Sequence, residues 1–217
     1  MKLVHTRSRD EETANAYTHL VWAILSLTFM FIFLKEEGLP MKYKTSTILM
    51  TGLSAWTFIS SFLYHASAGR KKKQNREVDK ASIFLMIIGC GVSLNMSCID
   101  PLVSSISSSI LIVVGAFLTM LYTHFKNPTE AFSVTSYVLL GWFCILPITG
   151  LLGDSLYSIT SSSWMIIAGG ISYSIGILFY AKDSIKWNHT RWHACVMIGY
   201  GFHLAGHYAT MQSVLVP

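Results

Sequence analysis

Apolar residues occur along this chain in seven long runs, which short clusters of polar and charged residues separate. Each run reaches about 19 residues of mainly apolar character, the length that a helix needs to cross a bilayer. The runs lie near residues 18–36, 45–68, 79–98, 104–124, 131–150, 160–181 and 189–213. We therefore predict an all-α membrane protein in which residues 1–217 form a single domain, a bundle of seven transmembrane helices. Glycines dilute the sixth run and histidines the seventh, so a bundle of six spans is the alternative.

The composition also indicates a lipid environment. Of the 217 residues, 52% are hydrophobic and only 12% are charged, which is more apolar surface than a soluble domain of this size can bury. The polar segment 1–17 contains six charged residues, so the first run begins too late for a signal peptide and we predict a retained first span. The four cysteines show no CxxC spacing, which argues against a thiolate metal site or a disulfide framework.

The basic residues predict the orientation of the bundle. With the N-terminus placed in the cytoplasm, 13 of the 16 lysines and arginines fall on cytoplasmic segments, and only Lys35, Lys42 and Lys44 fall outside. This asymmetry satisfies the positive-inside rule and, with an odd number of spans, places the C-terminus outside. Because the basic residues lie in short loops, membrane topology explains the net charge of +5, and we predict no nucleic-acid binding.

Residues that can bind a metal or carry a charge are rare in the predicted spans, and they gather at one end. Ionisable side chains are costly inside a bilayer and usually mark function there. The cytoplasmic ends of the first, second, third and seventh spans carry His19, Ser61, His65, Asp79, His189 and His193. Since the chain direction alternates between spans, these residues share one depth and can meet although they are distant in the sequence.

The pair His189 and His193 is the clearest indication of a metal site. Residues four apart stack on one helical face at roughly 6 Å, which suits two imidazoles that bind one ion. His65 could supply a third nitrogen, and three protein ligands with one water molecule form the usual catalytic zinc site. Asp79 could bind that water or the metal, and Ser61, one turn before His65, could orient the ligand or contact substrate. We therefore predict Zn²⁺ as the cofactor.

These residues also have structural explanations. The HxxxH pair could be an interfacial or hydrogen-bonded pair, His65 could belong to an aromatic belt, and Asp79 could be the N-cap of its helix. A second HxxxH, His203 and His207, lies about 15 and 21 Å further along the seventh helix, too far to share the first ion. We expect polar packing between helices for this second pair, with a proton relay or a second metal as alternatives.

Taken together, these motifs resemble those of the hemolysin III family of bacterial membrane proteins, within the progestin and adipoQ receptor superfamily. Residues 11–19, EETANAYTH, are similar to the EExANxxTH opening of that family, and residues 61–65, SFLYH, to its SxxxH on the second span. Asp79 follows at the start of the third span, and residues 189–193 are similar to the HxxxH of the seventh. His203 lies where relatives have a further histidine. The resemblance spans nearly the whole chain.

The resemblance implies a bundle of seven spans with a cytoplasmic N-terminus, in agreement with the distribution of charge. It implies three zinc ligands, His65, His189 and His193. It also implies that Asp79 holds a zinc-bound water and that Ser61 stands beside the site.

The opening motif of the family adds three further candidates, Glu12, Asn15 and His19. We expect these residues to pack the N-terminal segment against the site. The short and strongly basic segment between His65 and Asp79 is typical of the bacterial subgroup, which implies a location in the bacterial inner membrane.

We predict that the protein is a zinc-dependent hydrolase of amide or ester bonds in membrane lipids, such as ceramide-like molecules that enter from the bilayer. One alternative is a sensor or regulator of membrane state in which structural zinc ties three spans together. A second is an ion or proton channel or transporter, which the intramembrane His203 and His207 motivate. An open fourth coordination position favours the hydrolase, and a closed site favours the regulator. Membrane lipids are the expected partners, and no sequence feature indicates an oligomeric state.

Overall fold

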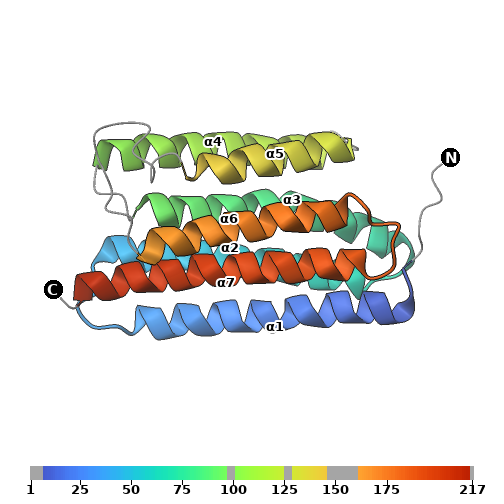
Figure 1. Ribbon diagram of the computed structural model, residues 1–217, viewed down its shortest axis with the longest axis horizontal. Coiled ribbons are helices and arrows are strands. Elements are labelled where there is room, and N and C mark those ends of the chain that lie inside the picture. Colours follow the sequence, from blue (N-terminus) through green and yellow to red (C-terminus); the bar gives the residue numbers. More distant parts are fainter. Residues whose placement is uncertain (1–6, 97–100, 125–128, 146–160, 216–217) are drawn as a thin grey trace.

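A computed structural model of the chain describes residues 7–96, 101–124, 129–145 and 161–215. Over these ranges the chain is helical and contains no strand, so the predicted all-α fold is confirmed. The helices run side by side along the long axis of the molecule (Figure 1). They are α1 (Arg9–Leu34), α2 (Met41–His65), α3 (Gly69–Asn95), α4 (Pro101–His124), α5 (Glu130–Phe143), α6 (Ser161–Tyr180) and α7 (Asn188–Leu215).

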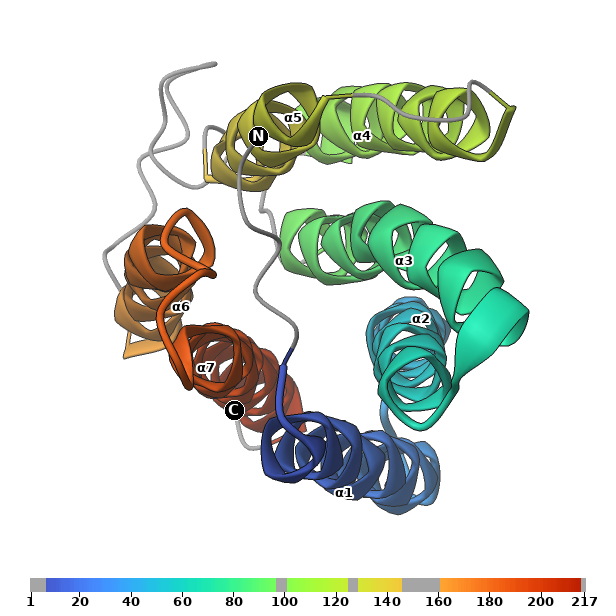
Figure 2. The ribbon, with the colours of Figure 1, turned by 90° about the vertical axis from the view of Figure 1, so that its right-hand side faces the viewer.

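The helices form a ring in which the first helix, α1, and the last, α7, are neighbours. Viewed along the helix axes, α7, α1, α2 and α3 follow one another around the bundle, and α6 lies beside α7 (Figure 2). α4 and α5 lie on the side of α3 that faces away from α1 (Figure 2). Because α1 contacts α7, residues from the start and the end of the chain can contribute to one site.

The outer surface of the bundle is suited to lipid. Three of the described helices, α1, α2 and α4, are long and apolar enough to cross a membrane, and Trp164–Tyr180 is a shorter apolar helix. Large apolar side chains face outward, with 68% of Leu102, 67% of Val113 and 66% of Leu178 exposed. Such a surface is stable in a bilayer and not in water. The protein is therefore a helical membrane protein, while the remaining spans and the cytoplasmic N-terminus stay predictions.

Hydroxyl groups join the helices inside the bundle. Ser26 of α1 donates a hydrogen bond to the carbonyl oxygen of Thr51 in α2 at 2.9 Å, and its hydroxyl also contacts that of Tyr200 in α7. Ser93 of α3 donates to the carbonyl oxygen of Ser46 in α2 at 2.8 Å. Such bonds are a common way of holding membrane helices together, because lipid offers no hydrophobic driving force between them.

α3 begins earlier than the apolar pattern predicts. Only residues 66–68 separate it from α2, so the basic residues 70–73 lie on a helix and do not form a loop. The possibility that Asp79 is an N-cap is therefore wrong, since Ala68 occupies that position and Asp79 lies well inside the helix. The physical reason is that lysine, arginine and glutamine are good helix formers, so the helix extends beyond its apolar part.

Candidate metal centre

Three histidines from two helices converge at one end of the bundle. His65 is the last residue of α2, and His189 and His193 lie in the first two turns of α7. All three are buried, with 4%, 8% and 2% of their surface exposed, respectively. One potential ligand atom from each lies within 4.8 Å of the other two, so the group could hold a metal ion. The spacing of four residues places His189 and His193 on one helical face, with ring centroids 4.6 Å apart.

The nitrogen atoms of these rings test whether a metal fits the site. His65 Nε2, His189 Nε2 and His193 Nδ1 are buried and have no hydrogen-bond partner among the residues that the structure describes. A buried polar atom without a partner costs roughly 1–3 kcal/mol, which a metal bound to it would offset. Neutral imidazole nitrogens are also ordinary zinc ligands. The donor set therefore fits a metal ion held by three histidines.

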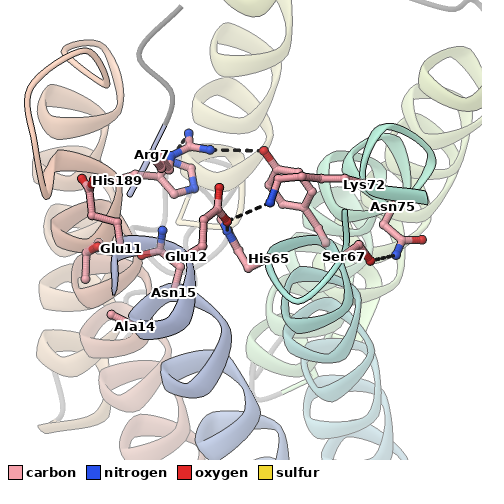
Figure 3. Close-up of polar contacts among 12 residues, drawn as sticks. Arg7, Glu11, Glu12, Ala14, Asn15, His65, Ser67, Lys72, Asn75 and His189 are labelled. Carbon is pink, nitrogen blue, oxygen red and sulfur yellow. Dashed lines mark hydrogen bonds and ion pairs between the residues drawn. The ribbon is translucent and has the colours of Figure 1, made fainter. Parts of the chain in front are cut away.

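Two carboxylates contact the other nitrogen of two of these rings. Glu12 Oε2 lies 2.7 Å from His65 Nδ1, and Asp183 Oδ1 lies 3.3 Å from His189 Nδ1. In Figure 3, Glu12 of α1 reaches His65 while Lys72 of α3 approaches the same carboxylate. Histidines that bind a metal almost always donate their second N–H to a carboxylate, a carbonyl group or water. The surroundings of His65 are therefore those expected of a metal ligand, and Asp183 offers His189 a partner of the same kind.

Arg7, which precedes α1, reaches into the same site (Figure 3). Its guanidinium donates to the Asp183 carboxylate at 2.5 Å and to the Tyr64 hydroxyl at 3.2 Å, and its Nη2 lies 3.0 Å from His189 Nδ1. Asp183 belongs to the segment between α6 and α7. Burial acts to raise the pKa of Asp183, but its contact with His189 and the charge of Arg7 together lower that pKa to about 2. The carboxylate is therefore ionised at neutral pH.

The opening motif of α1 packs against the start of α7. Glu11 accepts the backbone N–H of Trp187 at 2.7 Å through one carboxylate oxygen and that of Ser8 at 2.9 Å through the other. The bond to Ser8 belongs to the capping box that begins α1. Asn15 Oδ1 accepts the hydroxyl hydrogen of Thr190 at 2.7 Å. The bonds of Glu11 to Trp187 and of Asn15 to Thr190 connect α1 to the start of α7 beside the histidine group.

Ser61 and Asp79 lie in the wall of a cavity that two of the three histidines, His189 and His193, also line. The cavity has a volume of about 170 Å³, and His19, His189 and His193 form part of its wall. Ser61 lies close to Asp79 in this wall. Asp79 does not belong to the group of atoms close enough to share one ion. Asp79 is therefore outside this group but lines the same cavity as His189 and His193.

The same cavity extends into the apolar interior of the bundle. Met86 and Ile87 of α3, Val138 of α5 and Ile177 of α6 line it, as does His203 of α7. A mainly apolar cavity with a few polar groups at one end is typical of sites for amphiphilic ligands. The space beside the histidines is thus continuous with space suited to a hydrocarbon chain.

His203 and His207 lie outside the metal-binding group and contact neighbouring helices. His203 Nε2 lies 3.2 Å from the carbonyl oxygen of Ile166 in α6, and His207 Nε2 lies 2.9 Å from the Thr47 hydroxyl in α2. Contacts of this kind constitute polar packing between helices.

Sequence reasoning did not identify Arg7, Asp183 and Lys72 as parts of the site. Arg7 and Asp183 lie outside the apolar runs, and Lys72 stands in a basic cluster that topology alone explains. One available signal is that Asp183 is an acidic residue in an otherwise basic segment, six positions before His189. This position alone does not show that the Asp183 carboxylate contacts the His189 ring.

The fold and the site together describe a helical membrane protein with a candidate metal centre of three buried histidines at one end of the bundle. The chain matches the family described as Haemolysin-III related over residues 7–204 and belongs to that family. It is 28% identical over 200 residues to the Hemolysin-3 homolog of Bacillus subtilis (strain 168), which covers 87% of this chain and 89% of that protein. It is 26% identical over 200 residues to Hemolysin-3 of Bacillus cereus, with 89% of each chain covered. The family predicted from the motifs is thus confirmed.

Proposed function

We propose that this member of the haemolysin III family is a zinc-dependent hydrolase that cleaves amide or ester bonds of membrane lipids such as ceramide-like molecules. The observation that carries the proposal is a group of three buried imidazoles, two of which, His189 and His193, line a mainly apolar cavity that also contains the Asp79 carboxylate. A metal with three protein ligands keeps one position for water or substrate. We place the protein in a bacterial inner membrane with its N-terminus in the cytoplasm, which the distribution of basic residues supports.

The residues of the site have distinct roles in this reaction. His65, His189 and His193 hold zinc, which, when bound, acts as a Lewis acid toward a carbonyl oxygen and lowers the pKa of water. Asp79 accepts a proton at its carboxylate and returns it to the leaving amine or alcohol. Ser61, which lines the same cavity, is placed to donate its hydroxyl hydrogen to that carboxylate and so to orient it. The apolar wall of the cavity binds the hydrocarbon chain and keeps bulk water away from the reacting bond.

The proposal is tested by measuring zinc content and ceramide hydrolysis on the same detergent-purified samples. The variants are His65→Ala and His193→Ala, and the matched control is His124→Ala, since His124 is an exposed histidine at the end of α4. We expect near-stoichiometric zinc and ceramide turnover in the wild type and the control, and loss of both in the two site variants. A wild-type protein without bound metal would overturn the proposal.

A structural role for zinc is the second candidate. It is favoured by the way in which α1, α2 and α7 are tied together around the histidines, through Glu12 to His65 and through Asn15 to Thr190. A metal that joins α2 to α7 would complete this set of connections and suit a regulator of membrane state. Stoichiometric zinc without turnover of any amide or ester lipid would favour this candidate over the hydrolase.

A further inference from the structure

The contact between Glu12 and His65 determines which nitrogen of that ring can bind a metal. The side chain of His65 is fully buried, and its Nδ1 lies 2.7 Å from Glu12 Oε2. An ionised carboxylate can only accept hydrogen bonds, so Nδ1 carries the hydrogen. In a neutral imidazole the other nitrogen, Nε2, then has a free lone pair. This Nε2 is the atom of His65 that has no partner among the described residues.

Lys72 holds the carboxylate in position for this contact. Its Nζ lies 2.9 Å from Glu12 Oε2, the same oxygen that contacts His65. The ammonium group keeps Glu12 ionised and limits the rotation of its carboxylate. A residue from the basic first turns of α3 therefore supports a bond between α1 and α2, as Figure 3 shows.

The contacts of His189 are different and make the role of Glu12 clearer. His189 Nδ1 lies 3.3 Å from Asp183 Oδ1 but also 3.0 Å from Arg7 Nη2. Asp183 can only accept a hydrogen bond and Arg7 can only donate one, so the two favour opposite tautomers of the ring. A metal on His189 Nε2 requires the tautomer that donates to Asp183. Glu12 thus determines the tautomer of His65 before a metal binds. For His189, Asp183 and Arg7 compete, so neither tautomer is fixed in advance.

We propose that Glu12 is a positioning residue of the metal centre, which holds the His65 ring in the tautomer and orientation that present Nε2 to the ion. Asp183 performs the same role for His189 in competition with Arg7. The inference rests on the metal-binding part of the proposed function and is independent of lipid hydrolysis. It gives Glu12, the second glutamate of the opening motif, a role at the metal centre in addition to packing of the N-terminal segment.

The first test measures the tautomer of His65 directly in the metal-free protein. Nitrogen NMR of the full chain labelled at histidine reports which ring nitrogen carries the hydrogen, and His65→Ala identifies the signal. We expect the Nδ1–H form in the wild type and in Glu130→Gln, a control at an exposed carboxylate that pairs with Arg76. Glu12→Ala should give a mixture of tautomers. An Nε2–H form of His65 in the wild type would overturn the inference, whatever the metal content.

The second test measures metal affinity with cobalt as the probe. Mutation of such outer partners typically weakens metal binding roughly 10- to 100-fold, which we expect for Glu12→Ala by competition with a chelator. Glu12→Gln keeps an accepting oxygen and should lie between Glu12→Ala and the wild type. The visible cobalt absorption should change in Glu12→Ala and stay unchanged in Glu130→Gln. A purely structural role for Glu12 would lower thermal stability without changing that spectrum.

The outcomes separate this inference from the proposed function. Tight cobalt binding that is equal in wild type and Glu12→Ala would refute the positioning role and leave the metal site intact. Weakened binding in Glu12→Ala, in a protein that hydrolyses no lipid, would support the positioning role and count against the hydrolase. A wild type that binds neither cobalt nor zinc would refute both.

Discussion

His19 of α1 lies face to face with His193 of α7, with ring centroids 3.9 Å apart and ring planes inclined by 21°. Phe58 of α2 meets the His19 ring edge-on at 5.3 Å. Both nitrogens of His19 are buried and have no hydrogen-bond partner among the described residues. The imidazole of His19 therefore restrains a candidate metal ligand by ring stacking and leaves the nitrogens of His193 available.

Replacing His19 tests whether stacking is its role. Aromatic pairs contribute about 0.5–1.5 kcal/mol beyond simple burial, so His19→Ala should weaken metal binding by up to about tenfold. His19→Phe keeps an aromatic face against His193 and should bind metal nearly as well as the wild type. Competition with a chelator measures both variants. Equal loss in the two would show that a nitrogen of His19 is required.

Removal of the metal should destabilise the bundle, because the ion would connect α2 to α7. Ligand binding stabilises the folded state by about 2.7 kcal/mol when the free ligand exceeds its dissociation constant 100-fold. We expect EDTA to lower the thermal unfolding temperature of the zinc-loaded protein and added zinc to restore it. In His193→Ala the chelator should have no effect. A wild type that unfolds at the same temperature with and without EDTA would argue against a metal held between these helices.

Gly169 and Gly170 are neighbours in α6 that should respond differently to substitution. A Cβ atom on Gly169 would clash with the ring of His203 and lie 2.9 Å from the carbonyl oxygen of Gly199 in α7. We expect Gly169→Ala to lower the free energy of unfolding by about 1–3 kcal/mol, as overpacking does. Gly170→Ala is the control, since its nearest contact would be an ordinary 3.6 Å to Trp142. Thermal unfolding in detergent measures both, and equal effects would contradict the close approach of α6 to α7.

Because Asp183 is ionised in the folded protein, we expect the free energy of unfolding to fall at acidic pH. Its pKa is about 2 in the folded protein against an ordinary value of 3.8, so the unfolded chain binds more protons between these values. Its contribution to the free energy of unfolding is complete above about pH 4 and is lost as the pH falls through 2. With 39% of this side chain exposed, we expect a contribution below about 1 kcal/mol.

Asp183→Asn removes this titration and should reduce the loss of stability between about pH 4 and pH 2. Unfolding measured across this range in wild type and variant provides the check. The matched control is Asp10→Asn, at an acidic residue whose surface is exposed. Parallel pH profiles in the wild type and Asp183→Asn would mean that Arg7 and His189 do not stabilise the carboxylate.

Much of the site could be predicted because the sequence indicates how deep each residue of a helix lies in the bilayer. Apolar runs mark where each helix enters the bilayer, so His65 and the pair at the start of α7 could be placed at one level. The same depth brought in Asp79, Ser61 and His19, and the family motif at the start of α1 added Glu12 and Asn15. Depth alone does not give the rotation of each helix about its axis, and this rotation decides which side chains meet.

The contacts around the ligands could not be predicted for the same reason. Arg7 and Asp183 lie in connecting segments whose course depends on tertiary contacts, and Trp187, with a φ of 67°, redirects the chain just before α7. Lys72 lies on a part of α3 that the apolar pattern assigns to a loop. Charged residues near a membrane surface have topology as an ordinary explanation, which conceals any more specific role.

The two helices that supply the candidate ligands are made at very different times during synthesis. α2 leaves the ribosome early with His65, and α1 ahead of it already carries Glu12, so this pair can form in a partly inserted chain. His189 and His193 follow only when α7 has been made. The ion can therefore be loaded with all three ligands only after α7 has been inserted against α1. Delivery of a metal to this site would be a late step of biogenesis, and bound metal would mark chains whose assembly has reached α7.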